Sequence, residues 1–444
     1  MKTRTLSTAI SAKVVFAILL CASLAAVGLA SCQAAPTPTV APSATPTEPE
    51  PTPIPSTPIP PTEAPAPTDA PERTATPEPE PTAAPEVDTP AGAVNILVVV
   101  GQRGAEGSGW QIDAIDSNSI RPDVPAVSSL SLPGDLVVVA PGIGEAALDE
   151  LDAIGEREGV EGGGMGLLAE AVRFNFGVRV DHVMRFSHTG FMGLVDLLNG
   201  VEVAVDCPAT DGGTTLQPGV YLMDAEQALW YMQAPGPDGP LTAQERQRRL
   251  GEAIWRGMEE QGRLANLANL WEPFGYLLET DFSDAEVELL SELGAQLAPH
   301  NVRFTLLGEG LALPTEELNG RQVRRAPWDM IETQIAEAMG PEPEERGLYG
   351  AHEIEVWNGT QTAELDQLAA ARLHQAGFAA AVGRADRRAY TQTQLVVLTK
   401  DPSDDVTAAI AALFGLSDEQ IVAGTGGGAD YRLIVGADYQ PCPK

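Results

Sequence analysis

The stretch Ala93-Val94-Asn95-Ile96-Leu97-Val98-Val99-Val100, which runs into Gly101, decides the fold of the first domain. A nearly continuous apolar run rich in valine is typical of a strand buried on both faces of an α/β sheet. Further strands are predicted at Val127–Leu132, Val183–Phe186 and Val201–Val205. Helices are predicted at Gly162–Phe176, Gly190–Leu198, Asp224–Tyr231 and Thr242–Gln261. This alternation predicts a three-layer α/β/α domain over residues 93–340.

The helix predicted from Thr242 carries most of the candidate site residues. Its first residues, Thr242 to Glu245, have the Thr-x-x-Glu pattern of a capping box. Leu250, Ile254 and Met258 follow at intervals of four, which places them on one buried face. Arg248, Arg249 and Arg256 lie on the same helix, and most of them are expected to form a solvated face.

A second, smaller α/β unit is predicted over residues 348–440. Ile354–Trp357 reads as a strand that ends in the turn Asn358-Gly359-Thr360. The remaining elements are predicted to be a helix at Leu365–Ala376, strands near Phe378–Val382 and Gln394–Leu398, a helix at Val406–Leu413 and a strand at Tyr431–Val435.

The segment 32–92 has the composition of a disordered tether. Residues 33–91 hold 19 of the 37 prolines of the chain and almost no large apolar side chains. Such a segment cannot bury a core, and proline favours the extended polyproline II form. We interpret it as a spacer between a membrane anchor and the folded domains.

The N-terminus has the features of a secretory signal peptide over residues 1–31. Lys2, Arg4 and Lys13 precede an apolar run that is too short for a confident membrane span. The ending Leu29-Ala30-Ser31-Cys32 resembles the lipobox of bacterial lipoproteins, in which the cysteine is acylated. The sequence therefore predicts an extracytoplasmic protein anchored to the bacterial membrane through lipidated Cys32, with an ordinary signal or an uncleaved anchor as the alternatives.

The charge of the chain argues against nucleic acid as a partner. It has 27 Lys and Arg against 62 Asp and Glu, a formal net charge of -35. Such a field repels phosphate backbones, and aromatic residues for base stacking make up only 5% of the chain. Of the four cysteines, Cys207 and Cys442 remain beyond Cys32 and the signal peptide, and they can pair in an oxidising compartment.

Several segments, taken in order, resemble the LytR-CpsA-Psr family of bacterial envelope proteins. The longest match is Gly190–Val203, with the sequence GFMGLVDLLNGVEV. The others are Asn95–Leu97, Gln111–Ile115, Ser131–Asp135, Val180–Val183, Met223–Tyr231 and Glu245–Gln247. The tail resembles the LytR C-terminal domain through Val356–Thr360 and Leu433–Tyr439.

The resemblance implies a phosphotransferase that moves a glycopolymer from a polyprenyl-pyrophosphate carrier onto peptidoglycan. It implies Mg²⁺ as cofactor, and a cluster of arginines that hold the pyrophosphate. Asp113 matches a metal-binding aspartate, and Asp135 and Arg246 match family residues of the catalytic site. Gln247 also matches, and Arg249, one turn beyond Arg246, could add to a substrate-binding arginine patch.

Much of the family's charge is absent from this sequence. One metal-binding aspartate falls on Gln102 or Arg103. The positions of five family arginines are occupied by Gln111, Gly134, Gln233, Pro235 and Ala243. One charge-assisted contact stabilises such a transition state by about 2–4 kcal/mol, so the loss of several removes many powers of ten in rate.

Two functions follow from these residues. The first, which the chemistry favours, is a degenerate envelope protein that binds polyprenyl-linked carriers or wall glycopolymer without efficient catalysis. The alternative is a divergent Mg²⁺-dependent phosphotransferase. An active site would need at least two cations converging near Asp113 at the mouth of an apolar pocket; otherwise Asp113 and Asp135 are structural acids.

Overall fold

The protein is described here from a computed structural model. It describes residues 82–105, 108–211, 213–234, 240–298, 301–340 and 349–442, all within the compact unit Pro77–Lys444. The predicted signal peptide, Cys32 and most of the predicted tether lie outside these ranges. The last part of that segment lies inside them, and there the backbone N–H groups of Ala84 and Val87 donate to Phe174 and Gly177 of the first domain. No helix within the described ranges is long and apolar enough for a membrane span.

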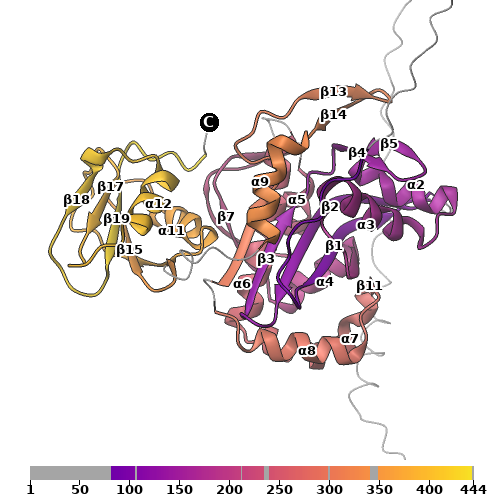
Figure 1. Ribbon diagram of the computed structural model, residues 1–444. Helices are drawn as coiled ribbons and strands as arrows, with labels where there is room; N and C mark the ends of the chain where they lie inside the picture. Colours follow the sequence, from indigo (N-terminus) through magenta and orange to yellow (C-terminus); the bar gives the residue numbers. More distant parts are fainter. Residues whose placement is uncertain are drawn as a thin grey trace, which may run out of the picture. The chain divides into compact units, whose positions relative to one another are not determined.

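A six-stranded mixed sheet forms the centre of the first domain (Figure 1). Its order is β11 (Leu278–Thr280), β6 (His182–Ser187), β1 (Val94–Arg103), β2 (Trp110–Arg121), β3 (Ala126–Ser131) and β12 (Val302–Leu306). β1 runs parallel to β6 and antiparallel to β2. The predicted strand at Ala93–Val100 is therefore confirmed as a central strand, whereas β2 has no counterpart among the predicted strands.

Smaller sheets flank the central one. β7 (Val201–Val205) pairs with β10 (Gly219–Met223), and β8 (Ala209–Asp211) pairs with β9 (Thr214–Leu216). The four-stranded sheet has the order β13 (Thr315–Leu318), β14 (Arg321–Arg325), β4 (Leu136–Ala140) and β5 (Gly144–Ala147).

Helices cover both faces of the central sheet and make the predicted three layers. The α-helices are α2 (Leu151–Glu158), α3 (Gly163–Phe176), α4 (His188–Leu197), α5 (Ala225–Gln233), α6 (Pro240–Glu260), α7 (Leu267–Phe274), α8 (Asp284–Gly294) and α9 (Trp328–Met339). Leu97 and Val99 of β1 belong to the core that α2, α3 and α9 complete. Their neighbours Ile96, Val98 and Val100 face the opposite side, toward α4 and α6. The alternation of side chains along β1 thus serves two cores.

The start of α6 differs from the sequence prediction. The helix begins at Pro240, so Thr242 lies within the helix and not at its start. Proline is well suited to a first helical turn because its missing N–H has no partner there in any case. The neighbouring helix α5 does carry a capping box, formed by Asp224 and Gln227.

The second domain is the predicted small α/β unit. Its five-stranded sheet has the order β16 (Ala379–Gly383), β15 (Glu353–Asn358), β19 (Tyr431–Val435), β17 (Gln394–Val397) and β18 (Ile421–Ala423). The helices are α11 (Leu365–Gln375) and α12 (Asp404–Phe414). A disulfide between Cys207 and Cys442 joins the first domain to the end of the second and confirms the pairing.

Candidate functional site

Asp113 occupies a β-bulge at the end of the central strand pair. Val100 pairs with Ala114 and Gly101 pairs with Ile112, so Asp113 is the extra residue of β2. A Cβ atom on Gly101 would lie 2.2 Å from the carbonyl oxygen of Gln111, so only glycine permits this approach. Bulges redirect a side chain out of the ladder, and this one sets the position of the Asp113 carboxylate.

Two side chains from other elements meet the Asp113 carboxylate. His188 Nε2 lies 2.6 Å from Asp113 Oδ2, and the Gln233 amide nitrogen lies 3.2 Å from Oδ1. His188 reaches this place because Gly101 of β1 pairs with Ser187, the last residue of β6, and α4 begins at the next residue. Gln233 is the last residue of α5.

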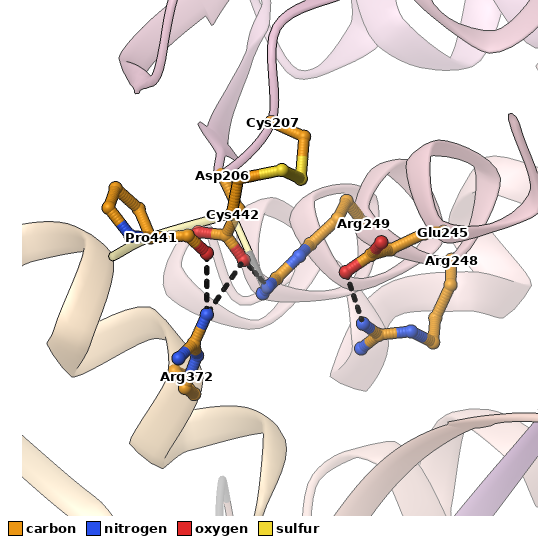
Figure 2. The surroundings of a disulfide bond; sticks show 8 residues. All are labelled: Asp206, Cys207, Glu245, Arg248, Arg249, Arg372, Pro441 and Cys442. Carbon is orange, nitrogen blue, oxygen red and sulfur yellow. Dashed lines mark hydrogen bonds and ion pairs between the residues drawn. A yellow bond between two sulfur atoms is a disulfide. The ribbon is translucent and has the colours of Figure 1, made fainter. Parts of the chain in front are cut away.

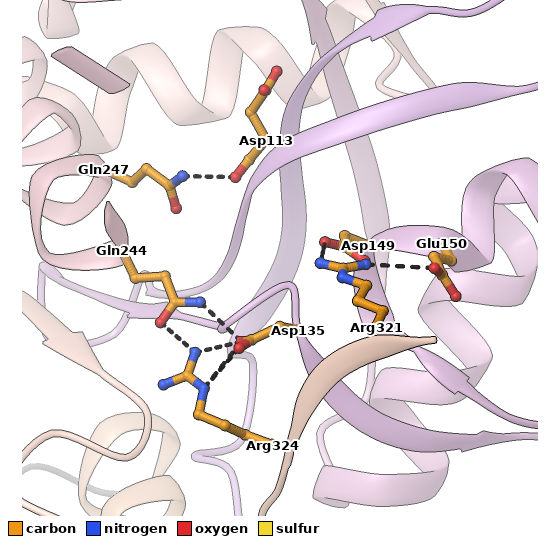
Figure 3. A network of polar contacts seen from close by, with 8 residues as sticks. All are labelled: Asp113, Asp135, Asp149, Glu150, Gln244, Gln247, Arg321 and Arg324. Atoms are coloured by element: carbon orange, nitrogen blue, oxygen red, sulfur yellow. Dashed lines mark hydrogen bonds and ion pairs between the residues drawn. The ribbon is translucent and has the colours of Figure 1, made fainter. Parts of the chain in front are cut away.

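Gln247 connects this cluster with a cavity. Its amide nitrogen donates to the backbone carbonyl of Asp113 at 2.7 Å, as Figure 3 shows, and its side chain also lines the cavity. The predicted pair Asp113 and Gln247 is therefore brought together, through the backbone of Asp113 and not its carboxylate.

The cavity has a volume of about 380 Å³ and an almost wholly apolar lining. One face of the central sheet forms one wall, and α4, α6, α7 and α8 contribute the others. Asp116 and Arg248 are its acidic and basic lining residues. Burial raises the pKa of Asp116 to about 6, although the Ser131 hydroxyl, at 2.5 Å, opposes the shift. Such a cavity suits a long hydrocarbon chain.

Asp135 is not part of the Asp113 cluster. The Arg324 guanidinium of β14 pairs with both of its carboxylate oxygens, and Gln244 contacts both partners (Figure 3). The pair is buried, with Arg324 5% and Asp135 7% exposed. Asp135 therefore has its charge satisfied within the fold.

Arg246, the one family arginine that this sequence keeps, points toward the backbone. Its Nε donates to the carbonyl of Tyr231 at 2.9 Å, and its Nη2 donates to the carbonyl of Ala234. The residue is 3% exposed, and burial lowers the pKa of the guanidinium. Arg246 holds the C-terminal end of α5, which carries Gln233.

The expectation of a solvated arginine face on α6 is wrong for Arg248 and Arg249. Both are 4% exposed. Arg249 pairs with Asp206, and Arg372 of the second domain approaches the same carboxylate at 3.9 Å (Figure 2). The two domains meet here beside the disulfide and cover this side of the helix, so Arg249 serves an ion cluster and not the Asp113 cluster.

Uncharged residues stand at the positions where the family has arginine and this chain does not. Gln111 is exposed and its amide oxygen accepts from Gln102 at 3.3 Å. At Gly134 a Cβ atom would lie 2.9 Å from the Cβ of Asp149, which is itself paired with Arg321. An arginine at position 134 thus requires Asp149 to shift. Pro235 lies outside the described residues.

The residues around Asp113 do not fit Mg²⁺. The ion prefers oxygen ligands in octahedral geometry, usually one or two carboxylates with waters and substrate phosphates. Both Asp113 carboxylate oxygens face nitrogen atoms of His188 and Gln233. Within the ranges that the structure describes, no three His, Cys, Asp or Glu side chains gather closely enough to hold a metal ion.

His188 contacts Asp113, Arg248 lines the cavity and Arg324 pairs with Asp135, and the sequence predicted none of these three roles. His188 lies two residues beyond the predicted strand at Val183–Phe186, and the strand-to-helix junction is the one available signal. His182, next to Asp181, stacks on Phe282 with ring centroids 4.2 Å apart, in agreement with a structural role.

The chain is similar to known proteins of the bacterial cell envelope. Residues 68–318 match the model of the LytR_cpsA_psr family, and residues 352–439 match the LytR cell envelope-related transcriptional attenuator model. A polyisoprenyl-teichoic acid–peptidoglycan teichoic acid transferase TagU of Oceanobacillus iheyensis is 26% identical over 200 residues, 45% of this chain and 62% of that protein. The TagT transferase of Bacillus subtilis is 31% identical over 133 residues, 28% of this chain and 39% of its own length.

Solved structures match part of the chain at low similarity. B. subtilis TagV is 16% identical, with a TM-score of 0.47 over 56% of this chain and 98% of that one. A structure described as TagT bound to LI-WTA is 20% identical, with a TM-score of 0.45 over 59% and 97% of the two chains. The chain spans less than two thirds of the length of the curated relatives it matches.

Proposed function

This chain belongs to the LytR-CpsA-Psr family, and on that premise we propose that it binds polyprenyl-linked carriers or wall glycopolymer in the cell envelope without efficient transfer. The observation that carries the proposal is the contrast between the cavity and the arginines. The apolar cavity suits a lipid chain, whereas Arg246, Arg249 and Arg324 are already engaged by groups of the protein itself.

The charge balance supports binding without catalysis. A pyrophosphate carries several negative charges, and its transfer requires cations that are free to receive them. Arg246 donates to backbone carbonyls, and Arg249 and Arg324 each face a buried carboxylate. Releasing a guanidinium from such a pair leaves a buried carboxylate unpaired, at a cost of about 3–5 kcal/mol.

Arg248 is the basic residue best placed for an anionic headgroup. It lines the cavity, and its closest acidic contact is Glu245, at 3.8 Å. One cation supports binding of a phosphate but does not replace the several contacts that stabilise a transition state. We therefore assign Arg248 to the headgroup end of a bound carrier.

Gly251 on α6 offers a direct test of the cavity. It lines the cavity, and a Cβ there would meet only Phe304, at 4.0 Å. In Gly251→Phe the ring fills the cavity, so binding of a polyprenyl monophosphate by the full chain in detergent should weaken at least about tenfold. Gly251→Ala is the matched control: it leaves the space open and should bind as the wild type does. Equal affinity in all three proteins would contradict a lipid-binding cavity.

Anchoring through Cys32 completes the proposed setting. The resemblance to a lipobox and the following proline-rich segment support a lipoprotein held at the outer side of the membrane. Metabolic labelling with a fatty-acid analogue should mark the wild type and not Cys32→Ala. Equal labelling of both proteins would contradict this assignment.

The named relatives favour the alternative, a divergent transferase, because they are described as teichoic acid transferases. The two functions differ in whether glycan is transferred, and not in whether the carrier binds.

A further inference from the structure

We propose that the Asp113 site of this chain works without a divalent cation, because each Asp113 carboxylate oxygen already has a side-chain nitrogen of His188 or Gln233 beside it and the position of the family's second metal-binding aspartate holds no acid. This inference concerns the same site as the proposed function and deepens it by removing the metal that the family resemblance implies. It does not require that the carrier binds.

The hydrogen-bond inventory supports this assignment. An ionised carboxylate only accepts hydrogen bonds, so the His188 ring nitrogen 2.6 Å from Asp113 Oδ2 carries the proton and donates it. A nitrogen that donates cannot also accept from the Gln233 amide, which lies 3.3 Å away. The amide proton therefore goes to Asp113 Oδ1, at 3.2 Å. Each carboxylate oxygen has one donor from a side chain.

The cluster is held in place by the backbone around it. The bulge fixes Asp113, and its carbonyl accepts from Gln247. His188 is the first residue of α4, whose start is capped by the Ser187 hydroxyl, and Gln233 ends the helix that Arg246 holds. A metal ion on either carboxylate oxygen would lie beside a donor that the fold positions from a separate element.

The position of the family's other metal-binding aspartate holds no acid in this chain. The family's other metal-binding aspartate aligns with Gln102 or Arg103, and Gln102 contacts Gln111. Arg103 lies over the Trp110 ring at 6.0 Å from its centroid. A cation at this position would oppose a bound divalent ion.

Imidazole nuclear magnetic resonance tests the proposal without substrate or activity. The full chain has five histidines, so ¹⁵N labelling of histidine gives few signals, and His188→Gln assigns the one of interest. We expect the His188 Nε2–H signal to move in Asp113→Asn and to stay in place when millimolar Mg²⁺ is added. Millimolar Mn²⁺ should broaden it no more than the signal of His352, which lies beside Asp430 in the second domain.

Either of two results would overturn the inference. A shift of the His188 signal with Mg²⁺, or broadening by Mn²⁺ beyond that of His352, would show that a cation enters the cluster. An unchanged signal in Asp113→Asn would show that the hydrogen bond is absent. Neither result bears on lipid binding, which the Gly251 variants measure separately.

Discussion

Asp116 provides the sharpest test of the cavity's electrostatics. Asp116 lies on the face of β2 that also carries Ala114 and Ile120, so its carboxylate is surrounded by apolar side chains. Its hydrogen-bond partner is the Ser131 hydroxyl, at 2.5 Å. The perturbation is Asp116→Asn, which keeps an acceptor oxygen for Ser131 and removes the charge.

The magnitude follows from the raised pKa. Burial raises the pKa of Asp116 from 3.8 to about 6, so between these values the folded protein binds more protons than the unfolded one. Stability then falls as the pH rises through this window, and the loss is complete above the folded-state pKa. A shift of about two units corresponds to about 3 kcal/mol at pH 7.5, and to about half of that at pH 5.

Asp116→Asn should therefore stabilise the first domain, and more strongly at the higher pH. The assay is urea unfolding of both proteins at pH 5 and pH 7.5, followed by tryptophan fluorescence. The free energy of unfolding of the variant relative to the wild type should increase by roughly 1 to 2 kcal/mol between these conditions. A difference that does not change with pH, or a variant less stable at pH 7.5, would refute the reasoning.

Two further predictions concern stability. Reducing the disulfide, or Cys442→Ser, should lower the free energy of unfolding by about 2–5 kcal/mol because Cys207 and Cys442 close a loop across 235 residues of sequence; identical urea midpoints with and without reductant would argue against this. Arg324→Leu leaves the buried carboxylate of Asp135 without its partner and should lower the free energy of unfolding by about 3–5 kcal/mol. Arg325→Leu, on the same β-strand, removes only exposed ion pairs, which contribute under about 1 kcal/mol each. Comparable losses in both variants, measured by urea unfolding, would contradict a buried pair.

The layers of the fold could be predicted from the sequence because their signals are local. The valine-rich run of β1 and the spacing of Leu250, Ile254 and Met258 on α6 report burial directly. β2 escaped prediction because Asp116 and Asn118 interrupt its apolar pattern. Both line the cavity, so the irregularity in the sequence reflects a wall that faces a space and not a packed core.

The site was harder to predict because its contacts are distant in sequence. His188 meets Asp113 through the parallel pairing of β1 with β6, and Arg324 reaches Asp135 from 189 residues further along the chain. Arg249 is buried beside the contact between the two domains, which no periodicity within α6 can reveal. The absence of the five family arginines was visible in the sequence. The groups that bind the arginines that are present could be identified only from the structure.

The most direct measurement of the central claim is glycan transfer by the full chain. Lipid-linked glycopolymer, a peptidoglycan acceptor and Mg²⁺ are supplied, and the B. subtilis TagT transferase serves as positive control. Because Arg246, Arg249 and Arg324 are engaged within the protein, we expect carrier to bind while polymer transfer stays at the level of a sample without protein. Transfer above that level, lost in Asp113→Asn, would contradict the account.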